Sequence, residues 1–160
     1  MKKKKVLFIS STGGHLEELT QLKELFDKYD YYIVTERTKS NMSLKKKYPK
    51  RVSYLIYGSY TTLGKKIIYP FKLLLNCFIS LFIYIKVRPK YIVSTGAHTA
   101  GPMCLIGKIF GSKIFIETFA NSKTKSRTGS IVYKFADLFI VQWKEMLELY
   151  PDATYGGWIF

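Results

Sequence analysis

The architecture of this chain can be worked out from the stretch VLFISSTGGH, residues 6–15. Residues 6–10 are a short apolar run that predicts a β-strand. Two glycines and a histidine follow, and residues 16–26 then repeat leucine and phenylalanine at the spacing of one helical face. A strand, a glycine-bearing turn and a helix in this order are typical of a parallel sheet with crossover helices.

The rest of the chain continues this alternation. Further strands are predicted at residues 31–35, 52–56, 91–94, 114–117 and 138–141. Helices are predicted at residues 101–110, 130–135 and 144–149, whereas the lysine-rich connection 40–50 has no clear pattern. We therefore predict an α/β fold, a Rossmann-like doubly wound parallel sheet, in a single domain that spans residues 1–160.

The composition limits the class of protein and points to anionic partners. With 48% apolar and 16% aromatic residues among 160, the chain can bury a core and is not a disordered tail. Its 26 lysines and arginines against 11 acidic residues give a formal net charge of +15. This charge favours nucleic acid, an anionic membrane surface or a phosphorylated substrate as partner, although a lysine-rich proteome would also produce it.

The cysteines and the N-terminus predict a cytoplasmic protein with neither a metal nor another cofactor. Cys77 and Cys104 lie in apolar runs without metal-ligand spacing, so we expect two small buried side chains in a reducing compartment. The lysines at 2–5 precede an apolar run that is too short for a signal peptide. Two histidines are too few for a closed metal site, and the sequence has no Asp-x-Asp pair.

The segment 67–85 is unusually apolar for a crossover helix. Residues 73–85 carry no formal charge, yet as a helix they would span roughly 20 Å, which is short of the ~30 Å of bilayer hydrocarbon. Lys72, Asn76, Ser80 and Tyr84 recur at every fourth position and form one narrow polar stripe. Two interpretations fit: a central helix buried under other elements, or a helix that packs one face on the sheet and exposes the rest to lipid.

The charges beside this segment favour contact with lipid. Basic residues precede and follow it, and such residues can reach the headgroups of an anionic membrane. A right-handed crossover would start the helix at the carboxyl edge of the sheet and return it to the amino edge. We therefore predict an anionic membrane surface as a partner. The predicted contacts are Lys65, Lys66, Leu74, Phe78, Phe82 and Ile85.

The turn after the first predicted strand is a candidate ligand site. In a doubly wound sheet this turn lies at the carboxyl edge, where ligands bind. Gly13 and Gly14 would let the backbone approach a ligand, and the N–H groups of the helix start, with Thr12 beside them, favour a phosphate or diphosphate. The imidazole of His15 could take a proton from an acceptor hydroxyl, or it could cap the helix without chemistry.

Two later loops at the same predicted edge carry further candidates. Gly96 and His98 belong to a loop of small residues that leads into a helix, which implies a ligand wider than one phosphate. After the next strand, Glu117 could hydrogen-bond sugar hydroxyls, orient a histidine or cap a neighbouring loop. Asn121 and Lys123 follow, and the basic run that begins there either contacts a diphosphate or is a solvated loop.

These motifs, in this order, resemble the amino-terminal domain of the peptidoglycan UDP-GlcNAc transferase, which makes lipid II on a GT-B fold. The resemblance is closer to a shorter family. That family includes the membrane-anchor subunit of the two-chain transferase that adds the second GlcNAc to a dolichol-linked precursor. It also includes bacterial capsule and exopolysaccharide proteins that assist a separate glycosyltransferase. The matching residues are 10–14, 34–37, 117–120, 135–137 and 141–143.

The resemblance implies one half of a split UDP-sugar glycosyltransferase that is inactive alone. The chain would bind a polyprenyl-diphosphate-linked sugar acceptor and hold the complex on the cytoplasmic face of the cell membrane. A catalytic partner chain would supply the nucleotide-sugar domain, in capsule or exopolysaccharide synthesis. His15 falls where the peptidoglycan enzyme has a histidine near the acceptor hydroxyl, and Glu117 where a carboxylate follows the fifth strand. His98 departs from that pattern, because the peptidoglycan enzyme has an aromatic residue there.

Two other functions stay open on the sequence. A charge of +15 would suit a nucleic-acid-binding protein, but the basic residues are scattered over several loops and no known DNA- or RNA-binding module is present, so nucleic acid is not the expected partner. A self-sufficient small nucleotide-dependent transferase is the other alternative, and it would bind a UDP-sugar without a second chain.

Overall fold

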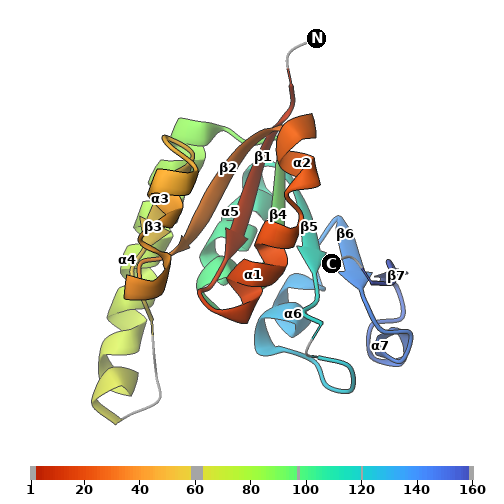
Figure 1. The fold of residues 1–160 in the computed structure, drawn as a ribbon. Coiled ribbons are helices and arrows are strands. Elements are labelled where there is room, and N and C mark those ends of the chain that lie inside the picture. The colour runs from red at the N-terminus through yellow and green to blue at the C-terminus, as the bar shows by residue number, and fades with distance from the viewer. Residues whose placement is uncertain (1–2, 59–62, 97, 120, 159–160) are drawn as a thin grey trace.

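The computed structural model describes residues 3–58, 63–96, 98–119 and 121–158. Within these residues, parallel strands form one sheet in the order β3-β2-β1-β4-β5-β6-β7 (Figure 1). The strands are β1 (Lys5–Ser10), β2 (Asp30–Glu36), β3 (Val52–Leu55), β4 (Tyr91–Gly96), β5 (Ser112–Ile116), β6 (Leu138–Val141) and β7 (Thr154–Tyr155). The order reverses between the neighbours β1 and β4, so their carboxyl ends form the topological switch point of the sheet.

Helices cover both faces of the sheet, which confirms the predicted Rossmann-like α/β fold. One face carries α1 (Gly14–Gln21), α2 (Glu24–Lys28), η1 (Lys39–Asn41) and α3 (Leu44–Lys47). The other face carries α4 (Leu63–Val87), η2 (His98–Ala100), α5 (Gly101–Phe110) and α6 (Arg127–Val132). The chain then passes through β6 and α7 (Met146–Leu149) to the edge strand β7.

Side chains of β1 point alternately to the two faces of the sheet and pack against the helices of both layers. Phe8 points to one face and packs edge-on against Phe26 of α2, with ring centroids 4.9 Å apart. Leu7 points to the other face, where it belongs to the same buried cluster as Ile83 of α4 and Met103 of α5. A fully apolar strand is what a central position between two layers requires.

Most of the predicted strands, and the helix Gly101–Phe110, are confirmed to within a few residues. The single helix predicted at 16–26 is wrong, because a turn at Leu22 and Lys23 divides it into α1 and α2. The unpatterned connection 40–50 contains part of η1 and all of α3, and β7 was not predicted. These short elements have too few residues to show a helical or strand period.

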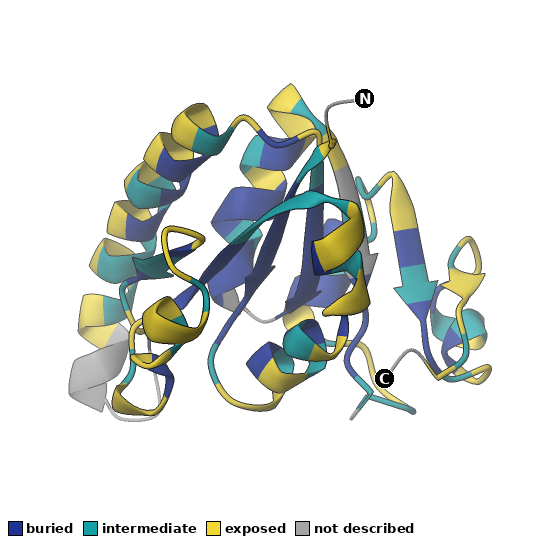
Figure 2. Cartoon of the chain, turned by 45° about the horizontal axis from the view of Figure 1, so that its top comes forward, coloured by how far each residue is buried: buried dark blue, intermediate teal, exposed yellow. Residues whose placement is uncertain are grey.

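Helix α4 has an orientation that the sequence did not reveal. Its polar stripe faces the sheet, where Asn76 and Ser80 are buried. The Asn76 side-chain amide bonds both the N–H and the carbonyl oxygen of Ile56, at 2.8 and 2.9 Å. Most of the large apolar side chains of α4, although not Ile83, therefore point outward, and exposed residues run along the outer surface of α4 (Figure 2). The interpretation of α4 as a helix buried under other elements is wrong.

The length of α4 also departs from the prediction. The sequence analysis took residues 73–85 as too short to cross a bilayer, but the helix continues on both sides of that stretch. In the described part of the chain, Ile67–Val87 is long and apolar enough to cross a membrane, by length and composition alone. Figure 1 shows α4 beginning beyond the carboxyl edge and returning along the sheet to the amino edge, as predicted for a right-handed crossover.

Candidate functional site

His15 and Thr95 meet at the switch point of the sheet. His15 lies in the first turn of α1, directly after β1, and Thr95 lies near the end of β4. The Nδ1 atom of His15 is 2.9 Å from the carbonyl oxygen of Thr95, and the Thr95 hydroxyl donates to the His15 carbonyl oxygen at 2.7 Å. This pair of bonds fixes the imidazole at the edge where doubly wound sheets bind their ligands.

The bond to Thr95 also determines which nitrogen of His15 carries the proton. A carbonyl oxygen can only accept a hydrogen bond, so Nδ1 must be the donor, and Nε2 of the neutral ring keeps its lone pair. The side chain is 29% exposed, and a carboxylate oxygen of Glu18 lies 3.9 Å from Nδ1. The geometry suits proton acceptance at Nε2, because the carboxylate would stabilise the resulting imidazolium. A catalytic role for His15 stays a prediction.

The glycine turn before His15 is open to a ligand. Gly13 has φ +80°, a conformation that residues with a side chain rarely adopt. No atom lies within 4 Å of the position that a Cβ would take on Gly13 or on Gly14. Thr12 is less free, because its N–H donates to Glu36 and its hydroxyl pairs with that of Thr38, each at 3.2 Å. The two glycines therefore offer the open surface, and Thr12 supports it.

Glu36 is a functional candidate that the sequence analysis missed. It ends β2, its side chain is buried, and its two carboxylate oxygens accept the N–H groups of Thr12 and Gly58, the latter at 3.1 Å. Its carbonyl oxygen accepts a bond from the Asn41 amide at 2.6 Å. One residue thus joins the loops that follow β1, β2 and β3. Two sequence signals pointed to Glu36: its place directly after a predicted strand, and its place within residues 34–37, which match the resembling family.

Gly96 and His98 lie beside the glycine turn, as predicted. Gly96 ends β4 with φ +95°, and its carbonyl oxygen accepts the N–H of Ser11 at 3.0 Å. This bond joins the loops after β1 and β4 into one surface. His98 opens η2 directly before α5, but its side chain is outside the part of the chain that the structure describes.

Glu117 follows β5 at the same edge, but its carboxylate bonds mainly to the loop that comes directly after it. It is buried, and its carboxylate accepts bonds from the Thr118 N–H (3.2 Å), the Asn121 amide (3.2 Å), the Ser126 hydroxyl (3.3 Å) and the Tyr150 hydroxyl (3.2 Å). The prediction that Glu117 orients a histidine is wrong for His15, whose Nδ1 bonds the Thr95 carbonyl oxygen. Glu117 instead caps and shapes the 118–126 loop, which was the alternative interpretation.

The loop after β5 is tied to the first helix rather than isolated. The Thr118 hydroxyl donates to Glu18, the residue whose other carboxylate oxygen lies near His15. Asn121 is held by Glu117, whereas Lys123 is exposed on the loop. Glu18 thus connects His15 with the loop that carries the basic residues, a link that no sequence pattern indicated.

The structure offers no metal centre within the residues that it describes. No group of three or more histidine, cysteine, aspartate and glutamate side chains lies close enough there to hold an ion. Cys77 is half-buried and Cys104 is buried, and neither of these two residues is part of a disulfide. Burial was therefore predicted correctly for Cys104 and only in part for Cys77.

The predicted membrane residues of α4 are exposed. Leu74, Phe78, Phe82 and Ile85 are 57%, 63%, 69% and 56% exposed. Lys65 and Lys66 lie in the first turns of α4, and their side chains are outside the described part of the chain. An apolar groove of about 340 Å³ is lined by residues of α4, α5 and α6, among them Leu73, Leu105, Arg127 and Ile131.

With this geometry in place, comparison with known proteins identifies the family. Residues 6–159 match the family described as "Oligosaccharide biosynthesis protein Alg14 like". The chain belongs to this Alg14-like family. It is 26% identical to the mouse UDP-N-acetylglucosamine transferase subunit ALG14, over 96% of this chain and 82% of the mouse protein. It is 35% identical to the fission yeast subunit of the same name, over 43% of this chain and 36% of that protein.

Solved structures show the same fold in larger proteins. MurG of Acinetobacter baumannii superposes with a TM-score of 0.69 at 16% identity, over 89% of this chain and 42% of MurG. The Alg14-like chain therefore corresponds to less than half of that structure. This agrees with the expected likeness to one half of a GT-B glycosyltransferase.

Two finer predictions gain no support from these relatives. Neither the family description nor the names of the mouse and yeast proteins mentions a capsule or an exopolysaccharide. The same names do not place this chain at the cell membrane. The coarser prediction, a subunit of a UDP-sugar glycosyltransferase, agrees with the family.

Proposed function

We propose that this Alg14-like chain is the acceptor-binding and membrane-attaching subunit of a two-chain UDP-sugar glycosyltransferase. The observation that most directly supports this is the outward-facing apolar surface of α4. A crossover helix in a soluble protein buries its apolar side on the sheet. In α4 the polar stripe is buried and Leu74 and Phe78 are exposed, which suits a helix that lies on lipid.

A second chain would complete the site. The mouse and yeast relatives are named as subunits, and this chain covers 42% of MurG. The nucleotide-sugar-binding half would therefore come from a separate catalytic polypeptide. We propose UDP-N-acetylglucosamine as the donor, because the relatives are named for it. The acceptor would be a polyprenyl-diphosphate-linked sugar, as the resemblance in sequence implies.

His15 would act on the acceptor hydroxyl. As the hydroxyl oxygen attacks the anomeric carbon of the donor sugar, the new glycosidic bond forms, the bond to the phosphate breaks and UDP leaves. The hydroxyl proton would pass to Nε2 of His15, whose lone pair is available because Nδ1 donates to Thr95. Glu18 would stabilise the imidazolium. The open Gly13–Gly14 turn and Lys123 would contact the diphosphate of the acceptor.

The orientation on the membrane follows from the lipid on the acceptor. The polyprenyl chain stays in the bilayer, so the carboxyl edge must lie close to the headgroups for the diphosphate to reach His15. In Figure 1, α4 begins beyond this edge and the loop before α6 lies at the same edge. The apolar groove between α4, α5 and α6 could take the first isoprene units, with Arg127 near the phosphates. We place the complex on the cytoplasmic face of a membrane.

Reconstitution with the catalytic partner tests this function. The chain alone should neither bind a UDP-sugar nor transfer one, and adding the partner should produce transfer to a polyprenyl-diphosphate-linked acceptor. Tight UDP-sugar binding by the isolated chain would instead indicate a self-sufficient transferase. Binding to duplex DNA that exceeds binding to anionic liposomes at the same salt concentration would indicate a nucleic-acid-binding protein.

A further inference from the structure

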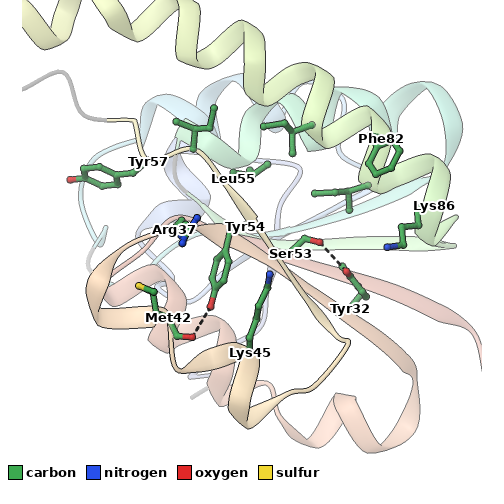
Figure 3. A pocket seen from close by; sticks show the side chains of 13 residues that line it. Tyr32, Arg37, Met42, Lys45, Ser53, Tyr54, Leu55, Tyr57, Phe82 and Lys86 are labelled. Atoms are coloured by element: carbon green, nitrogen blue, oxygen red, sulfur yellow. Dashed lines mark hydrogen bonds between the residues drawn. The ribbon is translucent and has the colours of Figure 1, made fainter.

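A second hollow of the described structure lies away from His15, on the other flank of α4. It has a volume of about 730 Å³ and lies between the edge strand β3, α3 and the second half of α4 (Figure 3). Strand β3 is at the end of the sheet, so no further strand covers this side. A hollow of this size is large enough for a small ligand.

The charged residues of this hollow are all cationic. Arg37, Lys45 and Lys86 line it, and no aspartate or glutamate is among its thirteen lining residues. The ion pairs found in the described part of the chain are His15–Glu18 and Arg51–Asp30, so neither uses these three cations. Glu36 is the sequence neighbour of Arg37, but its carboxylate oxygens already accept hydrogen bonds from the backbone N–H groups of Thr12 and Gly58. The hollow therefore attracts an anion.

Hydroxyl groups lie between the cations. The Tyr32 and Ser53 hydroxyls are 2.9 Å apart, and one proton suffices for the bond between them. The second proton is free to be donated to a ligand. Figure 3 shows the Lys45 and Lys86 amines pointing into the hollow from opposite sides of this hydroxyl pair. Two ammonium groups and a hydroxyl donor around one space are suited to the oxygens of a phosphate group.

The remaining wall of the hollow is apolar and continuous with the membrane face. Ile79, Phe82 and Ile83 of α4 line it. Phe82 is also one of the exposed residues that we place on the lipid. A ligand in this hollow would thus have its phosphate among the cations and an apolar part along α4. A free phosphate would leave the apolar wall unused.

We propose that this hollow binds the headgroup phosphate of an anionic phospholipid. The lipid's acyl chains would lie along Phe82 and the outer surface of α4. The inference rests on the proposed attachment to a membrane and adds to it a specific lipid site. The two sides of α4 would then have different roles. The acceptor would bind on the side of α5, and a structural lipid would bind on the side of β3.

The test uses soluble probes, so that general membrane attachment does not enter. The full chain is titrated with dihexanoyl phosphatidylglycerol below its micelle concentration, with dihexanoyl phosphatidylcholine and with inorganic phosphate. Binding is followed by the NMR amide shifts of residues around the hollow. We expect saturable binding of the anionic lipid, and weaker binding of the zwitterionic lipid because the cations repel choline. Phosphate binding that equals lipid binding would overturn the lipid assignment.

Two double variants separate a specific site from general charge attraction. Lys45→Gln/Lys86→Gln removes two lining cations, whereas Lys46→Gln/Lys90→Gln removes two exposed neighbours that do not line the hollow. The first pair should weaken anionic lipid binding by about tenfold or more, and the second by less than about twofold. Equal losses would contradict the proposal.

Phe82→Gln tests the apolar wall of the hollow. It should weaken lipid binding but leave phosphate binding unchanged, and thermal unfolding of each variant checks that it is folded. This assay involves neither the partner chain nor sugar transfer, so it can fail while the proposed function stands.

Discussion

Tyr150, in the loop after α7, donates a hydrogen bond of 3.2 Å to the buried carboxylate of Glu117, which directly follows β5. The backbone of Gly129 in α6 lies directly beside this hydrogen bond. A Cβ on Gly129 would lie 2.9 Å from the Tyr150 hydroxyl and 2.7 Å from the Ser126 hydroxyl, and it would also collide with the Glu117 carboxylate. The loop that holds Asn121 and Lys123 therefore depends on the absence of a side chain at position 129.

We predict that Gly129→Ala destabilises the protein. The added methyl group must displace Glu117, Ser126 or Tyr150, and overpacking of this kind costs about 1–3 kcal/mol. Gly101→Ala is the matched control, because the same methyl group at Gly101 would meet no atom within 4 Å. Urea unfolding measures both free energies. Equal values for the two variants would mean that the Glu117 network relaxes freely.

The stability of this network should depend on alkaline pH. Burial raises the pKa of Tyr150 above its ordinary value of 10.0, and the Glu117 carboxylate raises it further. Because the folded-state pKa is the higher one, the stabilisation is complete below the unfolded pKa of about 10 and is lost as the pH rises above it. We expect the free energy of unfolding to fall above about pH 10, and Tyr150→Phe to remove part of that fall.

The matched control for this measurement is Tyr155→Phe, which removes an exposed tyrosine hydroxyl. It should leave the alkaline slope of the wild-type protein unchanged. If Tyr150→Phe and the wild-type protein lose stability in parallel from about pH 8 to about pH 11, Tyr150 is not the group responsible.

In the complex with the catalytic partner, His15→Ala should lower kcat by roughly 10²-fold or more, because it removes a general base. Gln21→Ala, at an exposed position of the same helix, is the control and should leave kcat unchanged. Steady-state kinetics with varied acceptor separate the possible roles. A rise in acceptor KM with unchanged kcat would make His15 a binding residue.

The sequence was sufficient to predict the helices and strands whose apolar residues repeat with a clear period, and the turns between them. The strand at residues 6–10, the Gly13–Gly14 turn and the unusually apolar character of α4 could be predicted because each depends on local pattern or composition. The partners of Glu36 and Glu117 could not, because hydrogen bonds between distant loops leave no periodic signal. The direction of the α4 stripe was also hidden. Periodicity locates a polar face, but only Asn76 bonding to Ile56 shows that this face is buried.

Replacing exposed apolar residues of α4 should release the protein from anionic liposomes. Leu74→Gln/Phe78→Gln removes two large side chains, each of which contributes about 1.5–3 kcal/mol when buried in lipid. Trp158→Gln is the control, because Trp158 is an exposed aromatic residue outside α4. Liposome co-sedimentation measures the bound fraction. Partner binding should survive in both variants, and unchanged sedimentation of the α4 variant would contradict the membrane role of this face.

Finally, α4 should stay packed on the sheet when the protein binds a membrane. Ile67–Val87 is long enough to cross a bilayer, but crossing would expose the buried Asn76 and Ser80 to lipid and break both bonds between Asn76 and the Ile56 backbone. An unsatisfied polar group in hydrocarbon costs several kcal/mol, so attachment along the membrane surface is favoured. The Ile56 N–H, which donates to Asn76, reports on this contact. Its hydrogen exchange should remain slow after anionic liposomes are added, whereas Asn76→Ala should make it fast even without lipid. Loss of protection at Ile56 on liposome binding would show that α4 leaves the sheet and inserts.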